Sequence, residues 1–209
     1  EEFQETLPDI DYPGTDIDYP NFNPDAADME RVVGNPEEAM DGWHLQETDS
    51  SCAVAAQEFV LEALTGQEFD EEQLRELGLA NGWYSPEHGT YTYDVGRLMD
   101  ACGLNVEQST GNTIEDLEQC LNNGGGAVVS VDADEIWYGE KDDGSADDYA
   151  PGTGANHAIQ VIGIDYSQPE PMVILNDSGT PDGCGMMVPM DVFVDAGEDS
   201  GCFMAEAYM

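Results

Sequence analysis

The hydrophobic pattern of this chain changes period at a polar run, Asn122-Asn-Gly-Gly-Gly126. Before this run, apolar residues recur every three or four positions, which predicts amphipathic helices. After it, they form short continuous runs rich in Val and Ile, which predict buried strands. The expected strands cover residues 127–131, 157–164, 172–175 and 203–207. We therefore expect an α+β fold, with a helical N-terminal half packed on a C-terminal antiparallel sheet.

The helical half contains recognisable start and stop signals. Apolar residues at helical spacing, followed by Gly66, predict a helix over about 51–64. Asp70 is a good cap for a second helix over about 70–78, and Thr113 with Asp116 resembles a capping box. The remaining helices are expected over Tyr93 to Ala101, Thr113 to Leu121, and Met190 to Val194 after Pro189.

Residues 1–40 differ in composition from the rest of the chain. The sequence Asp9-Ile-Asp-Tyr-Pro13 recurs as Asp16-Ile-Asp-Tyr-Pro20, and proline at this density disfavours helices and central strands. We expect an acidic extended arm, either a linker or a strap on the domain held by Ile10, Tyr12, Ile17, Tyr19 and Phe22. Residues 41–209 are expected to form one domain.

The chain contains 46 Asp and Glu residues but only 4 Lys and Arg residues, which gives an extreme net charge of −42. Such a surface repels nucleic acids and anionic membranes, and it attracts basic peptides. It favours a halophilic protein or one in a calcium-rich exterior, and simple acidic solubility is the alternative. Carboxylates between residues 141 and 148 are a candidate Ca²⁺ loop, with a solvated flap as the alternative.

No apolar run is long enough to predict membrane insertion. The chain contains five cysteines but no CxxC pair, so a structural zinc site is not expected. If Cys52 is set apart, for the reason given below, the other four permit two disulfides or four thiols: Cys102, Cys120, Cys184 and Cys202. A secreted or cell-surface location is favoured slightly over a cytoplasmic one.

Cys52 occupies the first turn of the helix expected over 51–64. A helix N-terminus lowers a cysteine pKa, and the thiolate is the reactive nucleophile. Gln46 stands six residues earlier, where its amide can stabilise an oxyanion. His157 begins one expected strand, and the pair Asn176-Asp177 ends the next. The topology brings a thiol, a base and an orienting group to the interface of the two halves.

Three motifs carry a resemblance to a known family: Gln46-x5-Cys52, Asn156-His157-Ala-Ile-Gln-Val-Ile-Gly-Ile-Asp165 and Val173-Ile-Leu-Asn-Asp177. They resemble papain-like cysteine peptidases over residues 41–209, and most nearly the bacterial double-glycine leader peptidases of bacteriocin exporters. The resemblance implies peptide hydrolysis without a cofactor or metal, through a Cys-His-Asp triad. Asp177 maps to the third member, with Asn176 as its alternative, and Ser178 replaces the proline of the family pattern.

Weaker signals surround this constellation. The acidic and aromatic segment after the strand at 127–131 is a candidate substrate groove, through Asp132, Asp134 and Trp137, or else part of the core. His44 and His88 are interpreted as surface residues. A non-catalytic peptide-binding or effector module and a thioester-forming acyl transferase are the alternatives to a peptidase. Each of the three would take a peptide or protein as its partner.

Overall fold

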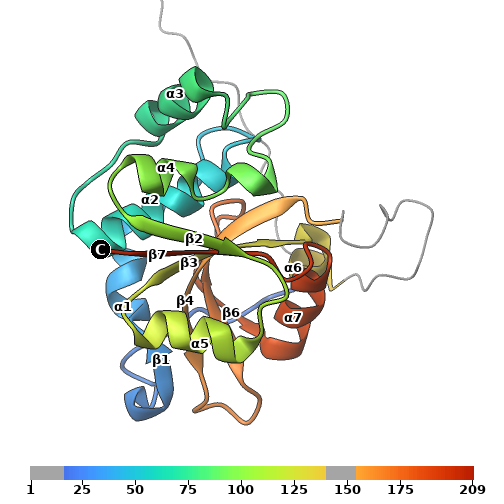
Figure 1. Ribbon diagram of the computed structural model, residues 1–209. Helices are drawn as coiled ribbons and strands as arrows, with labels where there is room; N and C mark the ends of the chain where they lie inside the picture. Colours follow the sequence, from blue (N-terminus) through green and yellow to red (C-terminus); the bar gives the residue numbers. More distant parts are fainter. Residues whose placement is uncertain (1–16, 140–153) are drawn as a thin grey trace, which may run out of the picture.

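The computed structural model describes residues 17–139 and 154–209, which form one sheet with helices on both faces (Figure 1). The seven strands are antiparallel, in the order β2-β7-β3-β4-β5-β6, and β1 pairs with β4 beyond the end of β3. The strands are β1 Val32–Gly34, β2 Asn105–Ser109, β3 Gly126–Val131, β4 His157–Asp165, β5 Met172–Asn176, β6 Cys184–Pro189 and β7 Met204–Tyr208. The helices are α1 Pro36–Ala39, α2 Cys52–Thr65, α3 Glu71–Asn81, α4 Arg97–Ala101, α5 Ile114–Asn122, α6 Ala133–Tyr138 and α7 Met190–Glu198.

The central strands β3 and β4 are buried along their whole length. Alternate residues of β3 contribute to different cores: Val129 and Val131 pack with residues of α5, α6 and α7, whereas Val128 packs with α2, α3 and α4. A strand covered by helices on both faces is apolar at most positions, which explains the nearly continuous apolar runs in the sequence. The expected strands at β3, β4, β5 and β7 are confirmed.

The helix that begins at Cys52 ends where the sequence predicts. Its buried face includes Val54, Phe59 and Val60, and Gly66 closes it in the left-handed conformation, with φ 64°. Asp70 caps α3 by accepting a hydrogen bond from the backbone N–H of Gln73. The capping box of Thr113 and Asp116 at the start of α5 is also present.

The prediction of a helix over Tyr93 to Ala101 is wrong for the first half of that range. The chain forms a 3₁₀ turn, Thr92–Asp94, and α4 starts only after Gly96, whose φ is 106°. A Cβ at Gly96 would lie 2.9 Å from the side chain of Val106, so the left-handed turn also lets this segment approach β2. Buried Gln57 of α2 joins the two helices, because its Oε1 accepts hydrogen bonds from the N–H groups of Gly96 and Leu98.

Part of the expected arm lies on the sheet. The N–H of Phe22 donates to the carbonyl of Gly185, the N–H of Met187 donates to that of Pro20, and the Phe22 ring is buried. Residues 32–39, placed in the same arm, form β1 and α1. Ile10, Tyr12 and the candidate calcium loop at 141–148 lie outside the described residues.

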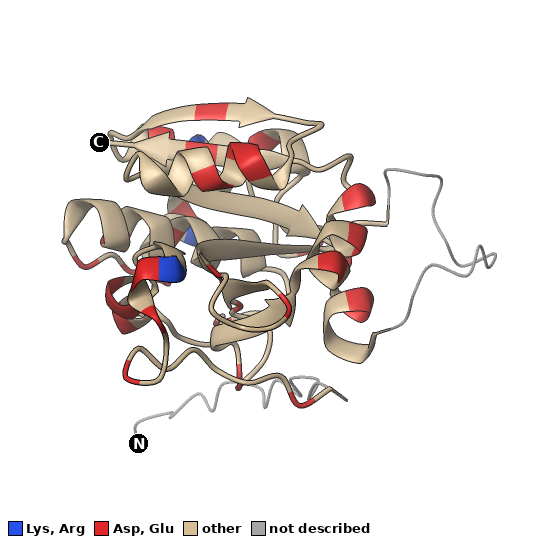
Figure 2. Cartoon of the chain, turned by 90° about the horizontal axis from the view of Figure 1, so that it is seen from below, with Lys and Arg blue, Asp and Glu red and all other residues tan. Residues whose placement is uncertain are grey.

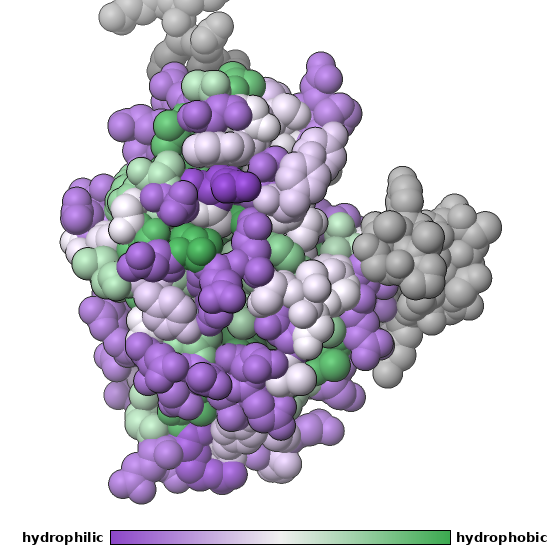
Figure 3. All heavy atoms as spheres, in the orientation of Figure 1, coloured by the Kyte–Doolittle hydropathy of each residue, from purple (hydrophilic) through white to green (hydrophobic). Residues whose placement is uncertain are grey.

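Acidic residues are spread over helices, loops and a strand, whereas basic residues are very few (Figure 2). The face seen in Figure 3 is mostly hydrophilic, with apolar residues in small separate areas. In the part of the chain that the structure describes, no helix is both long and apolar enough to cross a bilayer.

We expect salt to stabilise this fold, because it screens repulsion among the carboxylates. The screening length falls from about 10 Å at 0.1 M salt to about 3 Å at 1 M. A gain of about 2 kcal/mol in unfolding free energy would raise the melting temperature of a chain this size by roughly 4–8 °C. Thermal melts in 0.05 to 3 M NaCl measure the effect, with the same series at pH 4, where many carboxylates are protonated, as the comparison. A flat melting temperature at pH 7 would contradict the expectation.

Candidate active site

Three elements bring Cys52, His157 and Asp177 together. Cys52 is the first residue of α2, His157 is the first residue of β4, and Asp177 directly follows β5. Because β4 and β5 are antiparallel neighbours with Gln160 opposite Asn176, the start of β4 lies beside the end of β5. Helix α2 packs on β3 and β4, which places its N-terminus at this end of the sheet.

A chain of polar contacts joins the three side chains. His157 Nε2 lies 2.6 Å from Asp177 Oδ1, and the same imidazole interacts with the thiol of Cys52, since each of the two groups shifts the pKa of the other. His157 and Asp177 are buried, whereas Cys52 is partly exposed. The nucleophile candidate is therefore the member of the three that solvent can reach.

The pKa values of Cys52 and His157 shift in opposite directions. Burial opposes ionisation of Cys52, but His157 and the backbone N–H groups of Ala158 and Ala53 outweigh it and lower the thiol pKa below 9.0. Burial lowers the pKa of His157, but the charge and hydrogen bond of Asp177 have the larger, opposite effect, and the pKa is raised to about 10. These opposite shifts favour a thiolate beside an imidazolium, the form in which a cysteine attacks a carbonyl.

Asp177 is held from several sides. Its Oδ1 accepts a 2.8 Å hydrogen bond from the N–H of Gly179, and its Oδ2 accepts one of 2.8 Å from Trp137 Nε1. Its backbone carbonyl accepts a hydrogen bond from Trp43 Nε1 at 2.7 Å. Burial alone would raise the pKa of Asp177, but His157 and these donors hold it below its ordinary value. The carboxylate thus stays charged and fixed against the imidazole.

Trp137 lies against the candidate triad rather than in a separate groove. Its ring centroid is 5.1 Å from that of His157, and a Cβ at Gly179 would lie 2.8 Å from the Trp137 ring and 3.0 Å from His157 Cε1. The turn after Asp177 therefore requires a glycine to pass so close to the two rings. The Trp137 segment is a helix, α6, in which Asp132 caps the first turn and Asp134 is exposed.

Asn176, the alternative third member, is turned toward the sheet. Its Nδ2 donates to the carbonyl of Ala39 at 2.8 Å and to Gln160 Oε1 at 2.9 Å. These bonds tie β4, β5 and the end of α1 together. Of the two neighbouring residues, it is Asp177 that contacts His157.

Gln46 is bound to the residue that follows Asp177. Its backbone N–H donates to the carbonyl of Ser178 at 2.9 Å, and its Oε1 accepts a hydrogen bond from Ser178 Oγ at 3.1 Å. Its Nε2 donates to the carbonyl of Thr48 at 2.8 Å. Both Gln46 and Ser178 are buried. The serine that replaces the proline of the family pattern thus orients the amide of Gln46.

Replacing Ser178 with Ala is expected to lower kcat about five-fold, with a smaller change in KM. The substitution removes one neutral hydrogen bond, worth about 1 kcal/mol, from the Gln46 amide, which the sequence predicts to be an oxyanion donor. Steady-state kinetics on a cleaved peptide measure both constants. The control is Ser200→Ala, since the Ser200 hydroxyl donates to the carbonyl of Gly197, away from this site. An unchanged kcat in Ser178→Ala would remove Ser178 from this role.

His44 reaches the surface as expected, with its side chain 37% exposed, but it also belongs to a cluster of polar groups. Its imidazole is half-buried, lies 3.4 Å from Glu58 Oε2 and 3.8 Å from Glu71 Oε2, and contacts the ring of Phe59. The sequence signal for this cluster is Glu58, an acidic residue within the apolar face of the helix, which needs a partner when buried. His88 is exposed, as expected.

None of the five cysteines forms a disulfide, although the sequence left two disulfides open. Burial raises the pKa of Cys102, Cys184 and Cys202, and it raises that of Cys120 to about 11. Cys52 alone has a thiol pKa that is shifted downward.

No protein-family model matches this chain. It is 29% identical over 199 residues to an uncharacterized protein of Mycobacterium tuberculosis, covering 83% of each chain. Among solved structures, it is similar to a C39-like peptidase from Bacillus anthracis, with a TM-score of 0.62, 17% identity, and coverage of 85% of this chain and 98% of the other. It is also similar to procathepsin L 3 of Tenebrio molitor, with a TM-score of 0.54, 14% identity, and coverage of 94% and 75%.

These similarities define the class of the fold, which is that of the papain-like cysteine peptidases. The particular branch expected from the sequence is represented as well. A double-glycine motif protease from an AMS/PCAT transporter, solved in complex with its leader peptide, matches with a TM-score of 0.51 and 12% identity, over 79% of this chain and 89% of that one. At this level of identity the likeness concerns the fold.

Proposed function

We propose that the protein is a cysteine peptidase that hydrolyses peptide bonds with Cys52, His157 and Asp177, and with Gln46 as an oxyanion donor. The observation that carries this proposal is the continuous contact from the thiol through His157 to Asp177, with the thiol pKa lowered and the imidazole pKa raised. A structural cysteine would need neither the charged partner nor the exposure.

The chemistry follows from these positions. The Cys52 thiolate attacks the peptide carbonyl carbon, and the carbonyl oxygen becomes an oxyanion that the Cys52 N–H and the Gln46 amide stabilise. The protonated His157 gives its proton to the departing amine, which leaves a thioester on Cys52. A water molecule then attacks the thioester as His157 accepts its proton, and the thiolate is released with the acid product. Asp177 keeps the imidazole oriented in both steps.

The substrate is proposed to be a peptide segment, because a structural neighbour was solved with a leader peptide bound. The net charge of −42 favours a basic segment at low ionic strength. At high salt this preference weakens, since charges separated by more than a few ångströms are then screened.

Incubation of the protein with a mixture of peptides, followed by mass spectrometry, tests the proposal. Cleaved products that disappear after treatment with iodoacetamide support it. Peptides that are bound but stay intact would overturn it in favour of a binding module. Amine adducts formed without free acid would overturn it in favour of an acyl transferase. The mixture should contain basic, neutral and acidic peptides at 0.1 and 1 M NaCl, so that attraction by charge is separated from recognition.

A further inference from the structure

A second polar cluster lies behind the loop that precedes the catalytic helix. One nitrogen of His44 and one carboxylate oxygen each of Glu58 and Glu71 all lie within 4.8 Å of one another. Glu58 belongs to α2 and Glu71 to the first turn of α3, so two helices and the loop before α2 converge on this point. The two carboxylates are buried, and the His44 side chain, 37% exposed, opens the cluster to solvent.

Glu58 is the unusual member of this cluster. Its carboxylate is only 4% exposed, and its Oε2 has no hydrogen-bond partner among the described residues. His44 Nε2 lies 3.4 Å from this oxygen, within ion-pair distance. A buried carboxylate oxygen with no hydrogen bond is costly, and it is commonly satisfied by a cation. The oxygen therefore points to a ligand that lies between Glu58 and His44.

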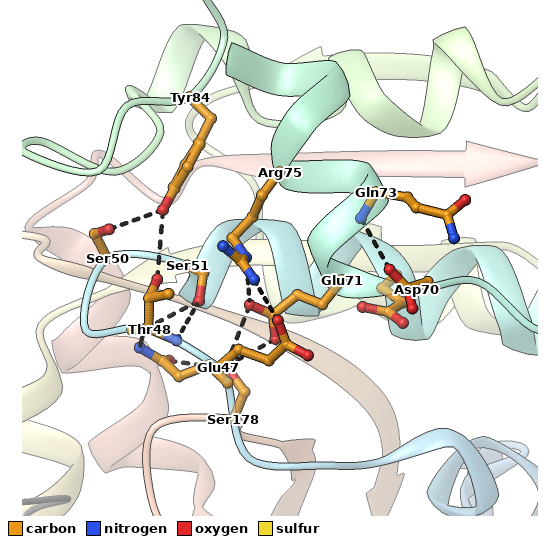
Figure 4. Close-up of polar contacts among 12 residues, drawn as sticks. Glu47, Thr48, Ser50, Ser51, Asp70, Glu71, Gln73, Arg75, Tyr84 and Ser178 are labelled. Carbon is orange, nitrogen blue, oxygen red and sulfur yellow. Dashed lines mark hydrogen bonds and ion pairs between the residues drawn. The ribbon is translucent and has the colours of Figure 1, made fainter. Parts of the chain in front are cut away.

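The cationic side chains nearby are already occupied. Figure 4 shows Arg75 of α3 pointing toward the carboxylates of Glu47 and Glu71. Arg75 forms ion pairs with both. Glu71 also accepts hydrogen bonds from the N–H of Glu47, at 3.0 and 3.2 Å from its two oxygens. Arg75 is thus paired with Glu47 and Glu71, and among the described residues the cationic group within ion-pair distance of Glu58 is the imidazole of His44, at 3.4 Å.

We propose that His44, Glu58 and Glu71 form a binding site for a divalent transition metal of the zinc type. One imidazole nitrogen with two carboxylate oxygens is a donor set that suits Zn²⁺, whereas Ca²⁺ and Mg²⁺ prefer oxygen ligands alone. Ligand atoms in a tetrahedral zinc site lie about 3.3 Å apart, given bonds of about 2.0–2.1 Å. Small side-chain rotations that move the ligand atoms by about 1 Å would bring them to that spacing. A water molecule would complete the coordination.

The site would act on the loop that carries Gln46. Glu71 holds the N–H of Glu47, the next residue after Gln46, so a metal on Glu71 fixes this end of the loop. The proposal does not depend on the peptidase activity.

Zinc titration by calorimetry tests the site, in a Cys52→Ala background because the thiolate and His157 could themselves bind zinc. High salt and 10 mM MgCl₂ occupy the surface carboxylates. We expect one equivalent to bind to Cys52→Ala, binding at least ten-fold weaker when His44→Gln is added, and unchanged binding when His88→Gln is added instead. Equal affinity with and without His44→Gln would overturn the proposal, and so would no binding at all.

A measurement without a ligand variant guards against misfolding of His44→Gln. The chain has three histidines, so NMR of their imidazole resonances in Cys52→Ala resolves each ring. Zinc at one equivalent is expected to shift the His44 signals and leave those of His88 in place. Shifts of His88 or His157 with none at His44 would place the metal elsewhere and overturn the proposal.

Discussion

Peptide hydrolysis is expected to fall by roughly 10⁴-fold or more when Cys52 is replaced by Ala, because removal of a catalytic nucleophile has effects of this size in other hydrolases. No other described thiol can take over the attack, since it is Cys52 that contacts His157. Alkylation by iodoacetamide at neutral pH is expected to disappear with the activity. Cleavage rates and intact-protein mass spectrometry measure the two losses.

Cys102→Ala is the matched control. Cys102 is partly exposed like Cys52, but burial raises its pKa, so it is mainly a neutral thiol at pH 7. We expect Cys102→Ala to keep both the cleavage rate and the rapid alkylation of one thiol. Rapid alkylation of Cys52→Ala at the rate of the unmodified protein would show that the reactive thiol lies elsewhere.

Asp177→Asn is expected to lower kcat by about 10³–10⁴-fold, although the shape of the side chain hardly changes. Both carboxylate oxygens now accept hydrogen bonds, Oδ1 from His157 and Gly179 and Oδ2 from Trp137. An amide must place its NH₂ group against one set of these donors. If that group faces His157, it imposes the wrong tautomer, an effect of this size in serine proteases.

The pH profile provides a second readout of the same variant. The active form requires an ionised Cys52 and a protonated His157, so activity rises with pH through the lowered thiol pKa and falls through the imidazole pKa near 10. Without the Asp177 charge, the pKa of His157 falls because burial then dominates. The alkaline limb of kcat/KM should therefore move to lower pH, which a series of buffers at constant ionic strength would measure.

Asp182→Asn provides the control, because Asp182 is an exposed carboxylate in the same turn. It removes one negative charge near the site without touching His157. We expect its pH profile to match that of the unmodified protein. If both variants moved the alkaline limb equally, the shift would reflect net charge and Asp177 would lose its assigned role.

Much of the fold could be predicted because its signals are local. The buried runs of β3 and β4, the capping box of Thr113, and the glycine that ends α2 each lie within a few residues of the element they define. Strands β1, β2 and β6 were missed. Strand β2 lies at the edge of the sheet and is mostly exposed, so its polar sequence carries no hydrophobic pattern.

The candidate site could be predicted only in part, for the same physical reason. Cys52, Gln46, His157 and Asp177 carry chemistry that shows in the sequence, and their spacing resembles a known family. Trp137, Ser178 and the His44 cluster depend on contacts between segments far apart in the chain. A tryptophan after a strand fits a core, a groove or a carboxylate partner equally well until the tertiary structure selects one.

The position of His157 in the sheet sets how the activity should be lost. From Gln160 onward, strand β4 is paired along both edges, with β5 on one side and β3 and β1 on the other, and His157 itself is paired with Val131 of β3. Segments of this kind exchange their amide hydrogens only when most of the molecule opens. The proposed general base is therefore part of the region that unfolds last, and inactivation by urea is expected to coincide with global unfolding. On refolding, an active molecule cannot appear before the central strands have found their register.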